Sequence, residues 1–192
     1  MMQKDIQNSL EASRQMVEQC LSDQALQAAL VKAVNCCVNA LKSGGKLMFA
    51  GNGGSAAEAQ HFSAEMVGRF LKERKPLASV ALSTDTSALT AIGNDYGYDQ
   101  VFSRQVEALG RSGDVLIVLS TSGRSKNILA AMRAAAALGV ATIAFTGREP
   151  REIGALADVV LNVPSSHTPQ IQEGHLILGH LLCGLVETQF TS

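Results

Sequence analysis

The stretch DVLIVLSTSGRSKNILAAMRAAAALGVATIAF, residues 114–145, contains the unit that decides the fold. Two short apolar segments, 114–120 and 140–145, have the length and composition of buried strands, and the alanine-rich segment between them has helical spacing. A strand, a helix and a second strand in this order are typical of a parallel sheet that is covered by helices on both faces.

Three more apolar segments of strand length occur at 46–50, 78–83 and 158–163, and helix-like stretches separate them. The sequence therefore predicts an α/β fold, a three-layer sandwich with a central parallel sheet of about five strands, as in flavodoxin-like proteins. The last segment, residues 171–190, follows Pro169 and is rich in Leu, Ile and Gly, so we interpret it as a buried final helix.

Two amphipathic helices are predicted to precede this sheet. Residues 3–43 contain no proline or glycine, their apolar residues recur at helical spacing, and Gly44 and Gly45 are suited to end the second helix. Little sheet is left for these helices to cover. We therefore expect one domain, residues 1–192, in which the helical pair at 1–45 packs on another subunit of a homo-oligomer.

Composition narrows the class of protein. The chain has 192 residues, 46% of them hydrophobic, and a formal net charge of −1, so no basic surface points to nucleic acid or to an anionic membrane. No apolar run approaches the roughly 20 residues of a membrane span. The cysteines show no CxxC spacing, and we interpret them as reduced core residues of a cytoplasmic protein: Cys20, Cys36, Cys37 and Cys183.

Two polar turns, AGNGGSA at 50–56 and LSTSGRS at 119–125, follow predicted strands and precede predicted helices. Glycines there let backbone N–H groups approach an anion, and the helix dipole favours negative charge, so a phosphate suits both turns. The dinucleotide pattern is matched only loosely and the Gly-Lys-Ser/Thr ending of a P-loop is missing. A tight turn without a ligand would also fit each loop alone, but five hydroxyl residues converge on this edge: Ser55, Ser120, Thr121, Ser122 and Ser125.

His61 and Glu65 are four residues apart, so they share one face of a helix and could grip a metal ion or act together on a substrate. An exposed hydrogen-bonded pair is the simpler interpretation of this common spacing. The final helix adds His175 and His180, and a histidine among apolar residues is more often a core residue than a ligand. The closeness of His61 to a phosphate-type turn favours the functional alternative.

Three separated segments resemble the bacterial phosphoheptose isomerase family of the sugar isomerase (SIS) domain superfamily: AGNGGSAAEAQHFSAE, AIGNDYGYDQVFSRQVEALGRSGDVLIVLSTSGRSKNI and IQEGHLILGH. The resemblance runs over almost the whole chain and implies a SIS-type fold. It also implies the conversion of sedoheptulose 7-phosphate into D-glycero-D-manno-heptose 7-phosphate, the first step of ADP-heptose and lipopolysaccharide core biosynthesis.

The resemblance further implies one zinc ion per subunit and a homotetramer. Carried over by position, Glu65 and His180 are the catalytic pair. The implied zinc ligands are His61, Glu65, Gln172 and His180. The implied substrate-binding residues are Asn52, Gly53, Gly54, Ser55, Glu65, Asn94, Asp95, Ser120, Thr121, Ser122, Ser125 and Gln172.

A non-catalytic relative that associates with the bacterial replication initiator is the alternative. That relative lacks the carboxylate corresponding to Glu65 and the histidine corresponding to His180, whereas this chain keeps both. One departure from the family is visible, because the family commonly has a Gly-Gly turn after FTG and this chain has FTGREPREIG. No transferred site residue lies in that loop, but its conformation is not given by the resemblance.

The spacing of two implied zinc ligands predicts a shared site. Gln172 and His180 are eight residues apart, which is about 12 Å along a continuous helix, whereas zinc bonds to nitrogen and oxygen are about 2.0–2.2 Å. Either Gln172 precedes the regular helix or one ligand comes from a neighbour. We predict that His180 joins His61 and Glu65 across a subunit interface.

Overall fold

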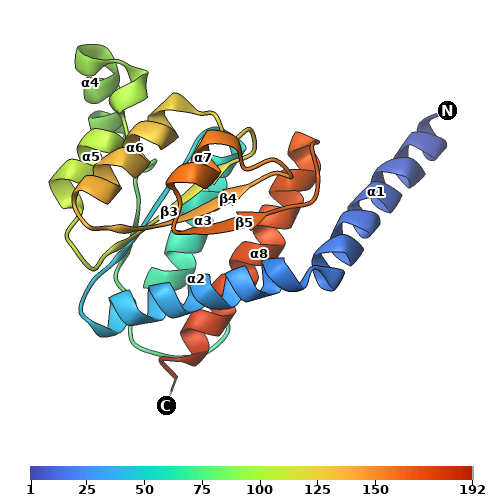
Figure 1. The fold of residues 1–192 in the computed structure, drawn as a ribbon, viewed down its shortest axis with the longest axis horizontal. Coiled ribbons are helices and arrows are strands. Elements are labelled where there is room, and N and C mark those ends of the chain that lie inside the picture. The colour runs from blue at the N-terminus through green and yellow to red at the C-terminus, as the bar shows by residue number, and fades with distance from the viewer. Residues whose placement is uncertain (192) are drawn as a thin grey trace.

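The computed structural model describes residues 1–191. Its centre is a five-stranded sheet in the order β2-β1-β3-β4-β5, with every neighbouring pair parallel (Figure 1). Each strand lies in its predicted segment or extends it by one residue, so the predicted fold class is confirmed. The strands are β1 (Leu47–Gly51), β2 (Ser79–Ala81), β3 (Val115–Ser120), β4 (Ala141–Thr146) and β5 (Val159–Asn162).

Helices cover both faces of the sheet. Alternate side chains of each strand enter two separate cores, as in β3, where Ile117 packs on one face and Leu116 on the other. The first core also contains residues of α2 (Gln24–Lys42), α3 (Gly54–Val67) and α8 (Thr168–Thr188). The second core contains residues of α5 (Ser103–Leu109), α6 (Lys126–Ala137) and α7 (Arg151–Leu156).

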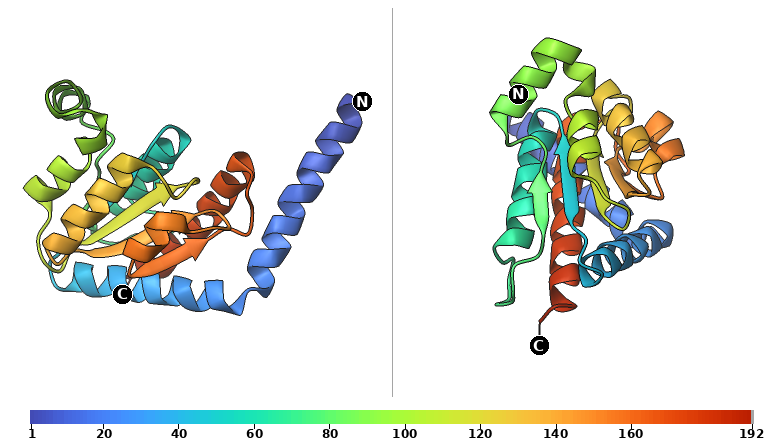
Figure 2. Two further views of the ribbon diagram at one scale, coloured as in Figure 1. Left: turned by 45° about the horizontal axis from the view of Figure 1, so that its top comes forward. Right: turned by 90° about the vertical axis from the view of Figure 1, so that its left-hand side faces the viewer.

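The two leading helices differ in how far they belong to this body. α2 packs along the sheet and ends before Gly44, whose φ of 81° supplies the predicted left-handed helix end. α1 (Met2–Ser22) projects from the body (Figure 1 and the left view of Figure 2) and buries only Met16 among its residues. Its exposed large apolar residues include Ile6, Leu10, Val17 and Leu21.

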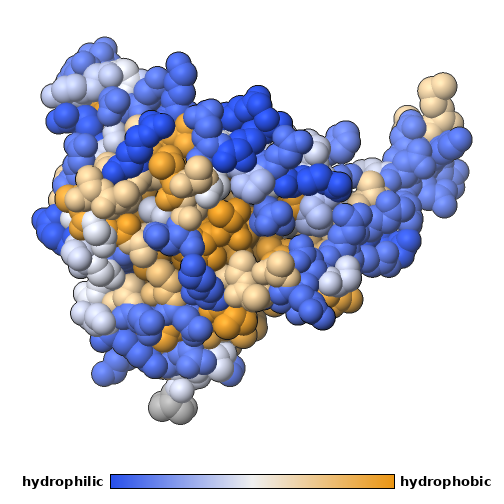
Figure 3. Space-filling view, viewed as in Figure 1, coloured by the Kyte–Doolittle hydropathy of each residue, from blue (hydrophilic) through white to orange (hydrophobic). Residues whose placement is uncertain are grey.

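The prediction that the final helix is buried is wrong for one of its faces. Leu176, Ile177, Leu181 and Leu185 are 37–48% exposed because only the opposite face of α8 packs on α3 and the sheet. Figure 3 shows further apolar side chains gathered around α2 on one face of the molecule. None of the helices in residues 1–191 is long and apolar enough to cross a membrane.

The cysteine prediction holds in part. Cys37 and Cys183 are buried core residues, whereas Cys20 and Cys36 are only partly buried. Both of the latter pack at the edge of the first core, where the helices meet solvent.

A glycine brings α3 and α8 unusually close together. A Cβ atom at Gly179 would lie 2.0 Å from the ring of Phe62, so only glycine lets this ring sit against the α8 backbone. At the far end of the contact, the buried Glu187 carboxylate accepts hydrogen bonds from the backbone of residues 70–72. Burial by itself raises the pKa of Glu187, but these N–H groups and Arg74 outweigh it and lower the pKa. The chain that follows α3 is thereby fixed to α8.

Candidate active site

The turn after β1, residues 51–54, is called the glycine turn here. Gly53 has a φ of 58°, a left-handed conformation that suits glycine, and α3 begins at the next residue. A Cβ atom at Gly54 would lie 2.4 Å from the amide nitrogen of Gln172, so the missing side chain lets Gln172 approach the backbone of the turn. The glycine turn therefore brings the start of α8 to the start of α3.

The loop after β3, residues 120–125, is called the serine loop. The hydroxyl groups of Ser120 and Ser125 lie 3.3 Å apart, and α6 begins immediately after Ser125. The Ser122 hydroxyl accepts a hydrogen bond of 3.3 Å from the backbone of Arg124. Three hydroxyl groups at the N-terminus of a helix form an arrangement suited to a phosphate.

The glycine turn and the serine loop are joined by a pair of asparagines. The side chains of Asn52 and Asn127 donate to each other over 2.9 Å in both directions, and the Tyr98 hydroxyl donates to Asn52 over 3.1 Å. Because the sheet order reverses between β1 and β3, both loops lie at the switch point where parallel sheets bind ligands. Sequence reasoning missed Asn127 and Tyr98, which carry no motif of their own.

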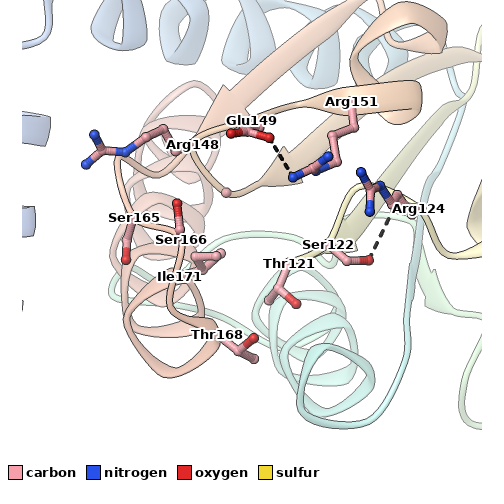
Figure 4. Close-up of a pocket in the computed structure, with 11 residues that line it drawn as sticks. Thr121, Ser122, Arg124, Arg148, Glu149, Arg151, Ser165, Ser166, Thr168 and Ile171 are labelled. Atoms are coloured by element: carbon pink, nitrogen blue, oxygen red, sulfur yellow. Dashed lines mark hydrogen bonds and ion pairs between the residues drawn. The ribbon is translucent and has the colours of Figure 1, made fainter.

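A polar pocket of about 230 Å³ opens beside the serine loop (Figure 4). Of the predicted site residues, only Thr121 and Ser122 line it. The serine loop also contributes Arg124, and the rest of the wall comes from the loops after β4 and β5 and from the starts of α7 and α8, through Gly147, Arg148, Glu149, Arg151, Ser165, Ser166, Thr168 and Ile171.

Two of the predicted metal ligands meet on the α3–α8 contact. The Nε2 atoms of His61 and His180 lie 2.7 Å apart, so one ring donates a hydrogen bond to the other. The Glu65 carboxylate lies 3.6 Å from the other ring nitrogen, Nδ1, of His61. The side chains of His61 and Glu65 are 41% and 19% exposed, so this group remains accessible. Glu65 and His180 thus approach one imidazole from its two nitrogens.

The prediction that His180 reaches His61 and Glu65 from another subunit is wrong for this group, because all three residues meet within one chain. The close packing of Gly179 on Phe62 places the next residue of α8, His180, beside His61. The predicted separation of Gln172 and His180 is correct, because Gln172 lies two helical turns from His180, at the glycine turn. Gln172 is therefore placed to contact a substrate at this turn and is not beside the histidines.

As the side chains lie in the structure, only two of the four predicted zinc ligands, His61 and His180, meet through their Nε2 atoms. Tetrahedral zinc holds two imidazole nitrogens about 3.3 Å apart, so His61 and His180 fit a ligand pair after a small separation. Glu65, however, faces the wrong nitrogen of His61, and Gln172 lies at the glycine turn. Within residues 1–191, no group of three or more His, Cys, Asp or Glu side chains is arranged to hold a metal ion.

Other predicted residues lie apart from this group. Asn94 and Asp95 are exposed on α4 (Thr86–Tyr96), where the Asn94 amide donates to the Asp95 carboxylate over 2.8 Å. The segment that follows α4 reaches the start of α6, where the Asp99 carboxylate lies 4.0 Å from the Lys126 ammonium group. Ser55 is buried in the first turn of α3, where its backbone N–H bonds to the carbonyl of Asn52. Ser55 therefore shapes the glycine turn.

A buried pair on the same two helices was missed. Glu58 Oε2 lies 3.7 Å from Nδ1 of His175, and both residues are at least 94% buried. Among the described residues, that carboxylate oxygen and both ring nitrogens have no hydrogen-bond partner. The sequence singled out His175, but the only available signal for Glu58 was its position seven residues before Glu65 on the same face of α3.

Comparisons with known proteins identify the family of the chain. A SIS domain family model matches residues 10–147. A phosphoheptose isomerase of Burkholderia pseudomallei (strain 1710b) is 54% identical over 182 residues, which cover 95% of this chain and 92% of the relative. The chain belongs to the phosphoheptose isomerase family. A relative of the same name from Rhodospirillum rubrum is 55% identical over 85% of this chain and 87% of its own length.

Solved structures of this family have the same fold. The phosphoheptose isomerase of Neisseria gonorrhoeae matches with a TM-score of 0.92 and 45% identity, covering 98% of this chain and all of that chain. The corresponding structure from Francisella tularensis gives a TM-score of 0.93 at 37% identity, covering 98% of this chain and 99% of that one. The chain is therefore a sugar-phosphate isomerase, and the non-catalytic alternative is not favoured.

Proposed function

We propose that Glu65 and His180 carry out the isomerisation of sedoheptulose 7-phosphate to D-glycero-D-manno-heptose 7-phosphate. The observation that carries this assignment is that both side chains approach the same imidazole, His61, on its two nitrogens. Family membership supplies the reaction, and the accessible acid–base group supplies the residues.

The reaction moves a carbonyl group between neighbouring carbons without redox change. A base removes the C1 proton of the ketose, a proton passes between the two oxygens through an enediolate, and an acid returns a proton to C2. A carboxylate and an imidazole suit these transfers because their pKa values can be tuned toward neutral pH. His61 lies between Glu65 and His180, so it is placed to orient both.

The serine loop is proposed to hold the substrate phosphate. Hydroxyls of Ser120, Ser122 and Ser125 cluster at the start of α6, where a dianion is favoured by the helix dipole. The glycine turn is joined to the start of α6 by the Asn52–Asn127 hydrogen bonds and is approached by Gln172, so we propose that this turn and Gln172 contact the sugar. Binding at the phosphate end would orient the reacting carbons.

The proposal includes a zinc ion, for which His61 and His180 would be two of the ligands. Glu65 and Gln172 complete the ligand set only if their side chains turn toward that pair. When bound there, zinc would polarise the substrate carbonyl. Metal content after purification, compared between the wild-type chain and His61→Ala, tests the assignment.

The proposed assembly is a cytoplasmic homotetramer held by the leading helices. Its support is the apolar surface left open on α1 and α8, which borders a groove of about 370 Å³. The residues lining that groove include Val17, Leu21, Leu26, Leu30, Ile177 and Leu181. Surfaces of this kind mark contacts between proteins. The mass in solution, measured by light scattering, tests the subunit number.

The experiment for the reaction is incubation of the full chain, with and without added zinc, with sedoheptulose 7-phosphate. We expect heptose 7-phosphate of unchanged mass, resolved from the ketose by anion-exchange chromatography. If neither preparation turns the substrate over, yet the sugar phosphate raises the unfolding temperature, the chain binds sugar phosphates without isomerising them and the assignment fails.

A further inference from the structure

The loop after β4, residues 147–151, holds an arginine in an unusual backbone conformation. Arg151 has a φ of 50° and is the only residue other than glycine with a positive φ in the described chain. Side chains with a Cβ atom are strained in this region, and such strain concentrates at functional sites. The loop therefore holds a residue with a Cβ atom in a backbone conformation that only glycine adopts without strain.

That guanidinium group points into the polar pocket. Figure 4 shows Arg151 and Arg124 on the same side of the pocket, across from Ser165 and Ser166. Arg151 forms an ion pair of 2.5 Å with Glu149 and keeps 37% of its side chain exposed. Arg148 differs, because its guanidinium group points out of the pocket and donates to the carbonyl of Pro164 over 2.6 Å.

The arginine side of the pocket is fixed beside the serine loop. A Cβ atom at Gly123 would lie 2.7 Å from the carbonyl oxygen of Pro150, and the backbone of Ile153 donates to Gly123 over 3.3 Å. The hydroxyls of Ser120 and Ser125, which face each other, do not line the pocket. The pocket shares Thr121 and Ser122 with the serine loop, and its arginine side offers a further place for an anion beside the one at the start of α6.

We propose that Arg124 and Arg151 bind a second phosphate group in this pocket, next to the phosphate of the sugar substrate. Two arginines, Arg124 and Arg151, lie on one side of the pocket with one glutamate, whereas the guanidinium group of Arg148 points away from it. Guanidinium groups bind phosphate oxygens in a planar, bidentate way, and the exposed ion pair with Glu149 contributes too little to prevent exchange. The ligand is either free phosphate or the second phosphate of a sugar bisphosphate.

The test counts phosphates by titration calorimetry of the full chain with inorganic phosphate, which requires no turnover. We expect two phosphates per wild-type chain. In Arg124→Gln and in Arg151→Gln the second phosphate should bind at least tenfold more weakly. Arg151→Gly should behave in the same way, and glycine accepts the left-handed backbone, so its loss of binding cannot come from misfolding. Arg148→Gln is the matched control and should keep both phosphates.

Sugar phosphates distinguish the two sources of the group. If fructose 1,6-bisphosphate binds the wild-type chain at least tenfold more tightly than fructose 6-phosphate, and Arg151→Gly abolishes that gain, the ligand is a second phosphate on a sugar. If the two sugars bind equally while two free phosphates are counted, the ligand is the free anion. A single phosphate per wild-type chain, or equal losses in Arg148→Gln and Arg151→Gly, overturns the proposal.

Discussion

The contact between α3 and α8 contains two groupings of glutamate and histidine that differ in access. His61, Glu65 and His180 form a chain of contacts that is partly open to solvent, whereas Glu58 and His175 face each other inside the core. The helices and residue types are the same. Only the first grouping can meet a substrate. Access to solvent therefore distinguishes a catalytic group from a structural one, whereas the spacing of residues along a helix does not.

The largest expected effect is on the exposed grouping. Glu65→Gln keeps the shape of the side chain and removes the base, so turnover should fall by about 10²- to 10⁴-fold. Turnover in His180→Gln should fall by a factor in the same range. Steady-state assays with sedoheptulose 7-phosphate measure both, with unfolding temperatures as the control for folding. If Glu65→Gln turned over at the wild-type rate, the accessible grouping would not be catalytic and would not differ in function from the buried one.

The sequence could predict what is local and could not predict what depends on how helices pack. The five strands could be predicted from the sequence, because a buried parallel strand is a short continuous run of apolar residues. The meeting of His61 and His180 depends on Gly179 lying on Phe62, which are 117 residues apart in the chain. No local pattern reports such a contact.

The errors in the site have the same origin. The predicted spacing of Gln172 and His180 along α8 is correct. The prediction of a site shared between subunits, however, assumed that both residues bind one zinc ion. In the structure, each of them meets a different turn of α3, so no second subunit is needed to bring His180 to His61. The sequence likewise could not reveal the exposed face of α8, because its leucines and isoleucine are of the same residue types as those in the core.

The next effect concerns the contact that creates the exposed grouping. Gly179→Ala places a methyl group against the Phe62 ring and should lower the free energy of unfolding by about 1–3 kcal/mol. It should also separate His180 from His61 and reduce turnover. Denaturant unfolding and kinetics measure the two results. Adding Phe62→Leu should recover part of both losses, and no recovery would mean that Gly179 matters for another reason.

A smaller effect is expected at the serine loop, because it is proposed to bind the phosphate, a group that does not react. Ser122→Ala and Ser125→Ala each remove one hydroxyl donor to the phosphate. The Michaelis constant should rise on the order of tenfold, while turnover stays nearly constant, because phosphate is bound equally in ground and transition states. A fall in turnover with an unchanged Michaelis constant would place the phosphate elsewhere.

The smallest effect is expected at the buried grouping, where Glu58→Gln is the counterpart of Glu65→Gln. Both glutamates lie on one face of α3, but Glu58 is 6% exposed and faces His175, which is fully buried. A base must come within hydrogen-bonding reach of the proton that it removes, and a carboxylate enclosed in the core cannot. Turnover in Glu58→Gln should therefore stay within about threefold of wild type, far from the 10²-fold or larger loss at Glu65. Measured side by side in one assay, similar large losses for both variants would show that the buried pair takes part in proton transfer, and access would no longer separate the two groupings.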